Sequence, residues 1–154
     1  MTDDITITTA SPRDLTRIQA LIGELSAFHG DTAQVTLEQL QGIFFGPYAQ
    51  GTAFVAREGD RIVGYAGVMR WTVIHSGQPR MDIQHLYIAD NRRNRGIGKA
   101  LIMAAKDHAE ALGAKGISIG TDPKNTSAQA AYRAMGLEEI TGAGPRFWIP
   151  VAQG

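Results

Sequence analysis

The chain has 154 residues, of which 44% are hydrophobic, and it carries 15 basic against 15 acidic side chains. This length predicts one domain over residues 1–154, and the balanced charge argues against a general nucleic-acid binder. The lack of cysteine excludes disulfides, a catalytic thiolate and cysteine-ligated zinc. With no signal-peptide pattern and no run of 18 apolar residues, we expect a cytoplasmic protein without a membrane partner.

The first part of the chain predicts one strand followed by two helices. Isoleucines alternating with threonines at 5–7 indicate a short strand. Residues 11–28 predict an amphipathic helix, because Ser11 and Pro12 suit its first positions and apolar side chains then recur at helical spacing. A capping box at 36–39 begins a second, short helix that should end near residue 45.

The middle of the chain predicts an antiparallel meander of three strands. The strands are expected at 52–57, 61–74 and 81–88, joined by the polar turns 58–60 and 75–79. Since each connection is short, neighbouring strands should pair as hairpins.

The last part of the chain alternates helices with strands. A strong helix is expected at 97–112, a buried strand at 116–120 and a second helix at 127–135, followed by strands at 137–140 and 146–151. The order β-α-α-β-β-β-α-β-α-β-β predicts a mixed α/β fold with a mostly antiparallel sheet. Only the crossover through the helix at 97–112 should join parallel strands.

A basic loop with two glycines joins the strand at 81–88 to the helix at 97–112. It reads Arg92-Arg93-Asn94-Arg95-Gly96-Ile97-Gly98-Lys99. A helix N-terminus offers unpaired N–H groups and the positive end of a dipole, and glycine lets an anion come close to the backbone. These features predict a phosphate-binding loop. The alternative is a basic turn exposed to solvent, followed by a helix whose first turn is weakened by glycine.

Two sequence signatures resemble those of the GNAT (GCN5-related) N-acetyltransferases. Leu86-Tyr87-Ile88, followed four residues later by Arg93-Asn94-Arg95-Gly96-Ile97-Gly98, is similar to the family's acetyl-CoA loop. Asn125-x-Ser127-Ala128-x-x-x-Tyr132-x-x-x-Gly136-Leu137 is similar to its second signature. The element order over residues 5–151 also resembles the family, so the likeness covers nearly the whole chain and implies a GNAT-like fold.

The resemblance implies transfer of an acetyl group from acetyl-CoA to an amine by direct attack in a ternary complex. It implies that N–H groups from Arg93 to Lys99 bind the pyrophosphate, that the backbone near Leu86, Tyr87 and Ile88 pairs with the pantetheine arm, and that an N–H near Ile88 polarises the thioester. Asn125 would bond the cofactor arm.

Tyr132 is implied to lie near the cofactor sulfur. A departing thiolate needs a proton, and a tyrosine with an ordinary pKa of about 10 stays protonated at neutral pH and can supply it. Asn125 and Tyr132 are two helical turns apart and can share a face. The alternative for Tyr132 is a half-buried core residue with its hydroxyl paired.

The attacking ammonium must lose a proton, and candidate bases lie on the strand at 81–88. We rank Asp82 first and His85 second, although either could be a structural partner in the sheet and water could relay the proton instead. Strand alternation places Asp82 and Gln84 on one face and His85 on the other, unless a bulge intervenes. Gln84 cannot act as a base.

The acceptor amine is expected near the first two helices and the hairpin. The candidates for binding it are Glu24, His29, Trp71 and Gln84, with Asp31, Glu38 and His75 also in reach. Most of these residues can equally be ordinary surface side chains, and Trp71 can be strand packing. Lys99, Lys124 and Arg133 could meet the 3′-phosphate of the cofactor or be solvated cations. The four histidines have no metal-ligand spacing, so we expect no metal.

The primary prediction is an N-acetyltransferase for a small amine. Alternatives are a protein N-terminal or lysine acetyltransferase, a non-catalytic acyl-CoA sensor domain, and a nucleotide-binding or nucleic-acid-binding protein. By analogy with the family we expect a homodimer.

Overall fold

The computed structural model describes residues 4–93, 95–142 and 144–152. The chain divides into two compact units, residues 1–120 and residues 121–154. The first unit contains the five-stranded sheet and helices α1, α2 and α3, and the second contains α4. In the described residues, no helix combines the length and the apolar character needed to cross a membrane.

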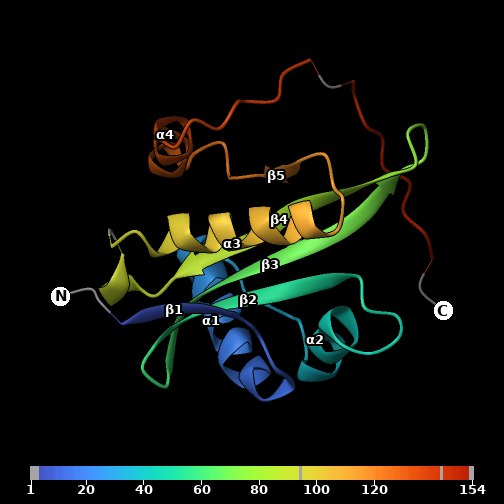
Figure 1. Ribbon diagram of the computed structural model, residues 1–154. Helices are drawn as coiled ribbons and strands as arrows, with labels where there is room; N and C mark the ends of the chain where they lie inside the picture. Colours follow the sequence, from blue (N-terminus) through green and yellow to red (C-terminus); the bar gives the residue numbers. More distant parts are fainter. Residues whose placement is uncertain (1–3, 94, 143, 153–154) are drawn as a thin grey trace. The chain divides into compact units, whose positions relative to one another are not determined.

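The sheet of the first unit has the strand order β1-β2-β3-β4-β5 (Figure 1). Its strands are β1 (Ile5–Thr9), β2 (Gly51–Glu58), β3 (Arg61–Val73), β4 (Gln78–Ile88) and β5 (Ile117–Ile119). The first four strands pair antiparallel, and β4 pairs with β5 in parallel. This topology confirms the predicted mixed α/β fold, the meander and the single parallel crossover. The strand β4 begins three residues before its predicted start at Met81.

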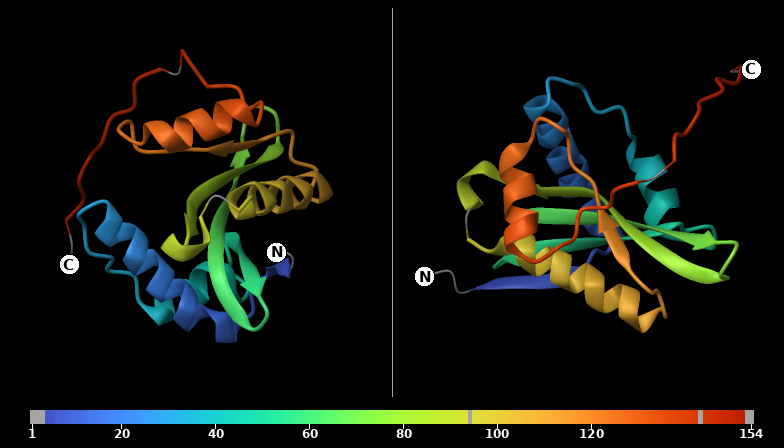
Figure 2. Two further views of the ribbon diagram at one scale, coloured as in Figure 1. Left: turned by 90° about the vertical axis from the view of Figure 1, so that its left-hand side faces the viewer. Right: turned by 90° about the horizontal axis from the view of Figure 1, so that it is seen from above.

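Helices cover both faces of this sheet, as Figure 2 shows. A short 3₁₀ turn, η1 (Pro12–Asp14), leads into α1 (Leu15–Phe28), and α2 (Leu37–Phe44) packs beside α1. The helix α3 (Ile97–Ala111) lies on the opposite face and follows a second 3₁₀ turn, η2 (Asp90–Arg92). All three predicted helices of this unit are confirmed to within about one turn.

The core lies where α1 and α2 meet the sheet. The apolar stripe of α1 is the reason that this helix forms here, since Ile18 and Leu21 are fully buried. They join Leu40 of α2 and Val55 of β2 in one cluster. At the start of this layer, Asp14 is buried and accepts a 2.6 Å hydrogen bond from Arg57. Burial by itself would raise the pKa of Asp14, but the bonds from Arg57 and Ser11 outweigh it and lower the pKa.

A β-bulge interrupts β4 at Gln84. Gly67 pairs with His85 and the next residue of β3, Val68, pairs with Ile83, so Gln84 is an extra residue in the ladder. The bulge reverses the alternation of side chains along the strand. As a result, His85 lies on the same face as Asp82 and Gln84, the face covered by α1 and α2. The sequence placed His85 on the other face from Asp82 and Gln84 unless a bulge intervened, and the structure has that bulge.

In the second unit, α4 (Thr126–Ala134) confirms the predicted helix. Asn125 caps it by accepting a 3.1 Å hydrogen bond from the Ala128 N–H. The two strands predicted at 137–140 and 146–151 are wrong, because the structure has no strand in the described residues there. Apolar side chains of this segment such as Phe147 and Ile149 are more than 80% exposed. An alternating pattern makes a strand only when a partner supplies ladder hydrogen bonds.

Candidate active site

The basic loop enters α3 through a left-handed glycine. Gly96 occupies the N-cap position with a φ of 77°, a conformation that glycine adopts without the Cβ clash of other residues. In the described part of the chain, no side chain caps this end of α3. The first intrahelical bond runs from the Ala100 N–H to the Gly96 carbonyl at 3.1 Å. Among the described residues, nothing occupies the N–H groups of the first turn of α3, where the helix dipole is positive.

The arginine side chains of the loop contact acidic groups of the protein. Arg92 and Arg95 bind the two oxygens of Glu58 at 2.8 and 3.3 Å. The hydrogen bond from Arg92 is the main reason that the pKa of Glu58 is lowered. These two arginines therefore bring less net positive charge to the loop than the sequence alone indicates.

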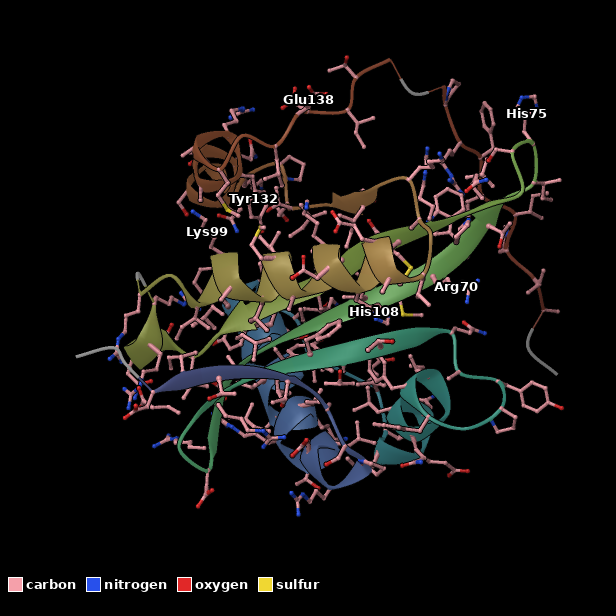
Figure 3. The ribbon with its side chains drawn as sticks, in the orientation of Figure 1. Arg70, His75, Lys99, His108, Tyr132 and Glu138 are labelled. Atoms are coloured by element: carbon pink, nitrogen blue, oxygen red, sulfur yellow. The ribbon has the colours of Figure 1, made fainter. Side chains whose placement is uncertain are left out.

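Arg93 connects the loop to the end of β4. It donates to the Ile88 carbonyl at 3.1 Å and pairs with Asp90. Its guanidinium also lies 5.1 Å from the ring centroid of Phe28 and 5.3 Å from that of Tyr87. Lys99 is exposed on the first turn of α3 (Figure 3). Asn94 lies outside the described residues.

The end of β4 divides its side chains between the two faces of the sheet. Leu86 and Ile88 are half-buried on the α3 face, where Ile88 and Ile97 both approach Gly64. Tyr87 is buried on the opposite face and donates to Glu24 at 3.4 Å. The strand is thus held on both sides just before the loop.

The two candidate bases have different environments on the α1 and α2 face. Asp82 is half-buried and accepts a 2.6 Å hydrogen bond from the Ser118 hydroxyl of β5. His85 lies in the bulge with its Nδ1 atom 2.6 Å from the Tyr65 hydroxyl. Burial lowers the pKa of His85, so the imidazole is neutral at pH 7.

Tyr65 determines which nitrogen of the neutral His85 ring carries the proton. Burial raises the pKa of Tyr65, so its hydroxyl keeps its proton at neutral pH. Among the hydrogen bonds of the described residues, His85 Nδ1 is the one acceptor for that proton. With the Tyr65 hydroxyl assigned as the donor, Nδ1 is the acceptor and Nε2 carries the ring hydrogen.

The predicted substrate-binding residues do not all lie together. Gln84 borders a cavity beside His85. Glu24 is on α1 and binds Arg17 and Tyr87, and His29 ends the same helix against the ring of Phe28. Trp71 lies toward the tip of the β3–β4 hairpin, where it is 49% exposed and pairs with Arg80.

The second unit contains the two remaining predicted site residues. The Asn125 side-chain oxygen caps α4 and also accepts from the Ser127 hydroxyl. Tyr132 is half-buried on α4, and burial raises the pKa of its hydroxyl. Among the residues that the structure describes, no three His, Asp or Glu side chains gather as metal ligands.

Sequence reasoning missed two residues that organise this region. Tyr65 lies in a buried strand, and its contact with His85 depends on the register of β3 against β4, which no local pattern indicates. Glu58 was expected only as part of a turn. The excess of arginines in the loop was a signal that an acidic partner was needed. The sequence did not identify Glu58 as that partner, because the pairing joins segments more than 30 residues apart.

Comparisons with known proteins agree with this architecture. A mycothiol acetyltransferase from Renibacterium salmoninarum is 28% identical over 117 residues, a match that covers 72% of this chain and 33% of that protein. The chain spans less than two thirds of the length of the curated relatives it matches.

Two solved structures share the fold. A possible acetyltransferase from Clostridium difficile 630 has a TM-score of 0.82 at 18% identity, covering 96% of this chain and 99% of that one. An aminoglycoside acetyltransferase from an uncultured soil metagenomic sample, in complex with sisomicin, has a TM-score of 0.79 at 22% identity, covering 96% of this chain and 98% of that one.

The family comparison covers the region that contains the candidate site. The acetyltransferase (GNAT) family matches residues 19–137, a range that includes β4, the basic loop, α3 and α4. The chain belongs to the acetyltransferase (GNAT) family.

Proposed function

We propose that the protein is an acetyl-CoA-dependent N-acetyltransferase that acetylates a primary amine of a small molecule. The observation that carries this proposal is the family match over residues 19–137. The names of a mycothiol and an aminoglycoside acetyltransferase among the similar proteins support a small-molecule acceptor. That residues 1–154 form one acyltransferase domain, that two copies form a homodimer and that the protein is cytoplasmic remain predictions.

The cofactor pyrophosphate binds the backbone N–H groups of the loop, from Arg93 to Lys99. The first turn of α3, which no described side chain caps, and the left-handed Gly96 support this assignment. The backbone from Leu86 to Ile88 pairs with the pantetheine arm, and Asn125 holds the arm from α4. Its nitrogen is the group that remains for this bond, because its oxygen caps the helix.

The reaction is a direct transfer. The amine nitrogen forms a bond to the carbonyl carbon of the acetyl thioester, and a backbone N–H near Ile88 stabilises the negative charge that develops on the oxygen. The carbon–sulfur bond then breaks. Tyr132 gives its proton to the leaving thiolate, in keeping with the raised pKa that keeps its hydroxyl protonated.

Asp82 is the first choice as the base that takes the proton of the attacking amine. His85 is the second, because Tyr65 occupies its Nδ1 and its Nε2 already carries hydrogen in the neutral ring. For His85 to act, Tyr65 would have to become the acceptor of an Nδ1 hydrogen. Proton transfer through water is the remaining route.

Initial rates distinguish direct transfer from an acyl-enzyme route. A chain without cysteine has no thiol to carry the acetyl group. We expect double-reciprocal plots for the amine, taken at several acetyl-CoA concentrations, to intersect. Parallel lines would show a covalent intermediate and contradict the ternary complex.

A matched pair of glycine variants tests the cofactor site. Gly98 on α3 and Gly42 on α2 are helical glycines, and a Cβ added at either meets no atom within 4 Å. We expect Gly98→Val to raise the Kd for acetyl-CoA at least about tenfold, because the side chain blocks close approach to the first turn. Gly42→Val should leave that Kd unchanged.

Calorimetric titration measures both affinities, and thermal unfolding checks that both variants fold. Equal affinity of Gly98→Val and the wild type would overturn the pyrophosphate assignment. If acetyl-CoA binds normally but no amine is acetylated, the protein is an acyl-CoA sensor instead. Preferred acetylation of peptides would favour the protein acetyltransferase.

A further inference from the structure

A small cavity opens beside the bulge of β4, on the face covered by α1 and α2. Its volume is about 210 Å³. The side chains that line it come from α1, the segment before α2, α2 itself and the strands β3 and β4: Ile22, Val35, Leu40, Ile43, Phe44, Tyr65, Met69, Gln84 and His85, with Gly67 between them. Gln84 and His85, two residues that the bulge brings together, form its polar end.

From this cavity we infer that the acceptor amine carries one compact apolar group, aliphatic or aromatic, and that polycationic amines are poor substrates. The inference rests on the proposed function and specifies its substrate class. The amine nitrogen lies at the polar end near Gln84 and His85, and the apolar group enters the cavity toward α2.

The charge of the lining supports an apolar occupant. None of the described side chains that line the cavity is acidic or basic apart from His85, which burial keeps neutral. A second ammonium group in this space would lose its hydration without gaining a counter-ion, which disfavours its binding.

The nearby carboxylates are used elsewhere. Glu24 pairs with Arg17 and accepts from Tyr87. Asp31 accepts from the backbone N–H of Thr32. The acidic pocket that a diamine or an aminoglycoside would need is therefore not formed by these residues.

The size of the cavity limits the group that can enter. An apolar cavity of roughly 150 Å³ is sufficient to bind benzene. The space of about 210 Å³ between Leu40, Phe44 and Met69 therefore suits a phenyl ring or a short branched alkyl chain.

Gly67 offers a way to reduce this space without strain. A Cβ added there would lie 3.5 Å from Tyr65, 3.6 Å from Phe44 and 3.8 Å from His85, which are ordinary contacts. We therefore expect Gly67→Ala to reduce the volume of the cavity by one methyl group and to leave the fold unchanged. Gly23→Ala is the matched control, because its methyl group on α1 meets no atom within 4 Å and Gly23 is not part of the lining.

The test is a panel of amines with acetyl-CoA, scored by thiol release and by the mass of the product. The panel contains methylamine, isoamylamine, 2-phenylethylamine, putrescine, spermidine, sisomicin and a short peptide. We expect kcat/KM for isoamylamine and 2-phenylethylamine to exceed that for each polycation by at least about tenfold.

The variants locate that preference in the cavity. Gly67→Ala should lower kcat/KM for 2-phenylethylamine by about tenfold while methylamine and the KM for acetyl-CoA stay unchanged, and Gly23→Ala should match the wild type. Val35→Glu, which adds a carboxylate to the lining, should raise the relative rate with putrescine. If Val35→Glu fails to fold, the Gly67 and Gly23 pair still decides the question.

The outcomes separate this inference from the proposed function. Preferred transfer to polycations or to the peptide, or an equal loss with all amines in Gly67→Ala, overturns the inference and leaves an N-acetyltransferase. No transfer to any amine by a protein that binds acetyl-CoA overturns the proposed function, and the inference with it.

Discussion

His108 on α3 illustrates how one half-buried side chain links the fold to pH. Its Nε2 lies 3.3 Å from the Thr52 hydroxyl, its ring packs edge-on against Phe54, and Figure 3 shows it pointing from α3 toward the sheet. Burial lowers the pKa of His108, as it does for His85. The folded protein therefore resists protonation at a pH where the unfolded chain already accepts protons.

The sign of the pH dependence follows from these lowered pKa values. The stability contributed by neutral histidine is fully present above the ordinary pKa of 6.5 and is lost as the pH falls through the lower folded pKa. We expect the free energy of unfolding to decrease from pH 7 to pH 5, and His108→Gln to make this decrease smaller. Urea unfolding over a pH series measures it. His75→Gln at the exposed hairpin tip is the control, and an unchanged slope in His108→Gln would contradict the expectation.

Tyr132 is the residue whose single hydroxyl carries the proposed acid role. We expect Tyr132→Phe to lower kcat by about 10²-fold or more while the Kd for acetyl-CoA changes little, since general acids contribute 10²–10⁴-fold. Tyr48→Phe is the matched control, because Tyr48 is 86% exposed. Steady-state rates and calorimetry separate the two effects. An unchanged kcat in Tyr132→Phe would contradict the acid role and favour the alternative that Tyr132 is a packing residue.

At the scale of elements, β3 carries two glycines with opposite surroundings. A Cβ at Gly64 would lie 2.9 Å from the Ile88 side chain and 3.2 Å from the Tyr87 carbonyl, whereas Gly67 has ordinary contacts at 3.5 Å or more. The close approach at Gly64 lets β3 and α3 pack on the end of β4, next to the proposed oxyanion-stabilising amide. The strand β3 thus has no room for a side chain at Gly64, whereas Gly67 borders the cavity proposed for the ligand.

This difference predicts opposite effects on stability. Gly64→Ala should lower the free energy of unfolding by about 1–3 kcal/mol, because the methyl group displaces the Ile88 side chain and crowds the Tyr87 carbonyl. Gly67→Ala should cause no loss, since it restricts the unfolded chain and meets no clash. Urea unfolding of both variants checks the pair, and equal destabilisation would show that the two sites are not distinguished by packing.

At the scale of the whole molecule, acetyl-CoA should stabilise the fold as a unit. At 100 times its Kd, a ligand adds roughly 2.7 kcal/mol, which for a chain of this size raises Tm by about 5–10 °C. We expect acetyl-CoA to give this shift, and ATP and DNA to give none. A shift with ATP or DNA alone would favour the nucleotide-binding or nucleic-acid-binding alternative.

The same melting experiment addresses domain organisation. If residues 1–154 form one domain, far-UV and near-UV signals should follow one transition, although the chain divides into two compact units. Two separated transitions would contradict the single-domain prediction. Sedimentation equilibrium tests the predicted homodimer.

Local patterns in the sequence determined most of the secondary structure. The helix α3, its glycine entry and the three meander strands depend on side chains close to one another in the chain, so periodicity and capping residues were sufficient to predict them. The loop at 92–99 was recognisable for the same reason. The strands predicted at 137–140 and 146–151 failed because a strand depends on a partner as well as on its own sequence.

Only the tertiary structure decided how the candidate site is assembled. The bulge at Gln84, the bond from Tyr65 to His85 and the contacts of Glu58 with the loop all depend on the register between distant strands. The apolar cavity likewise combines side chains from five segments, and the acidic pocket expected for a polycation is absent from its described lining. Register and packing arise from long-range contacts, which a pattern of neighbouring residues does not contain.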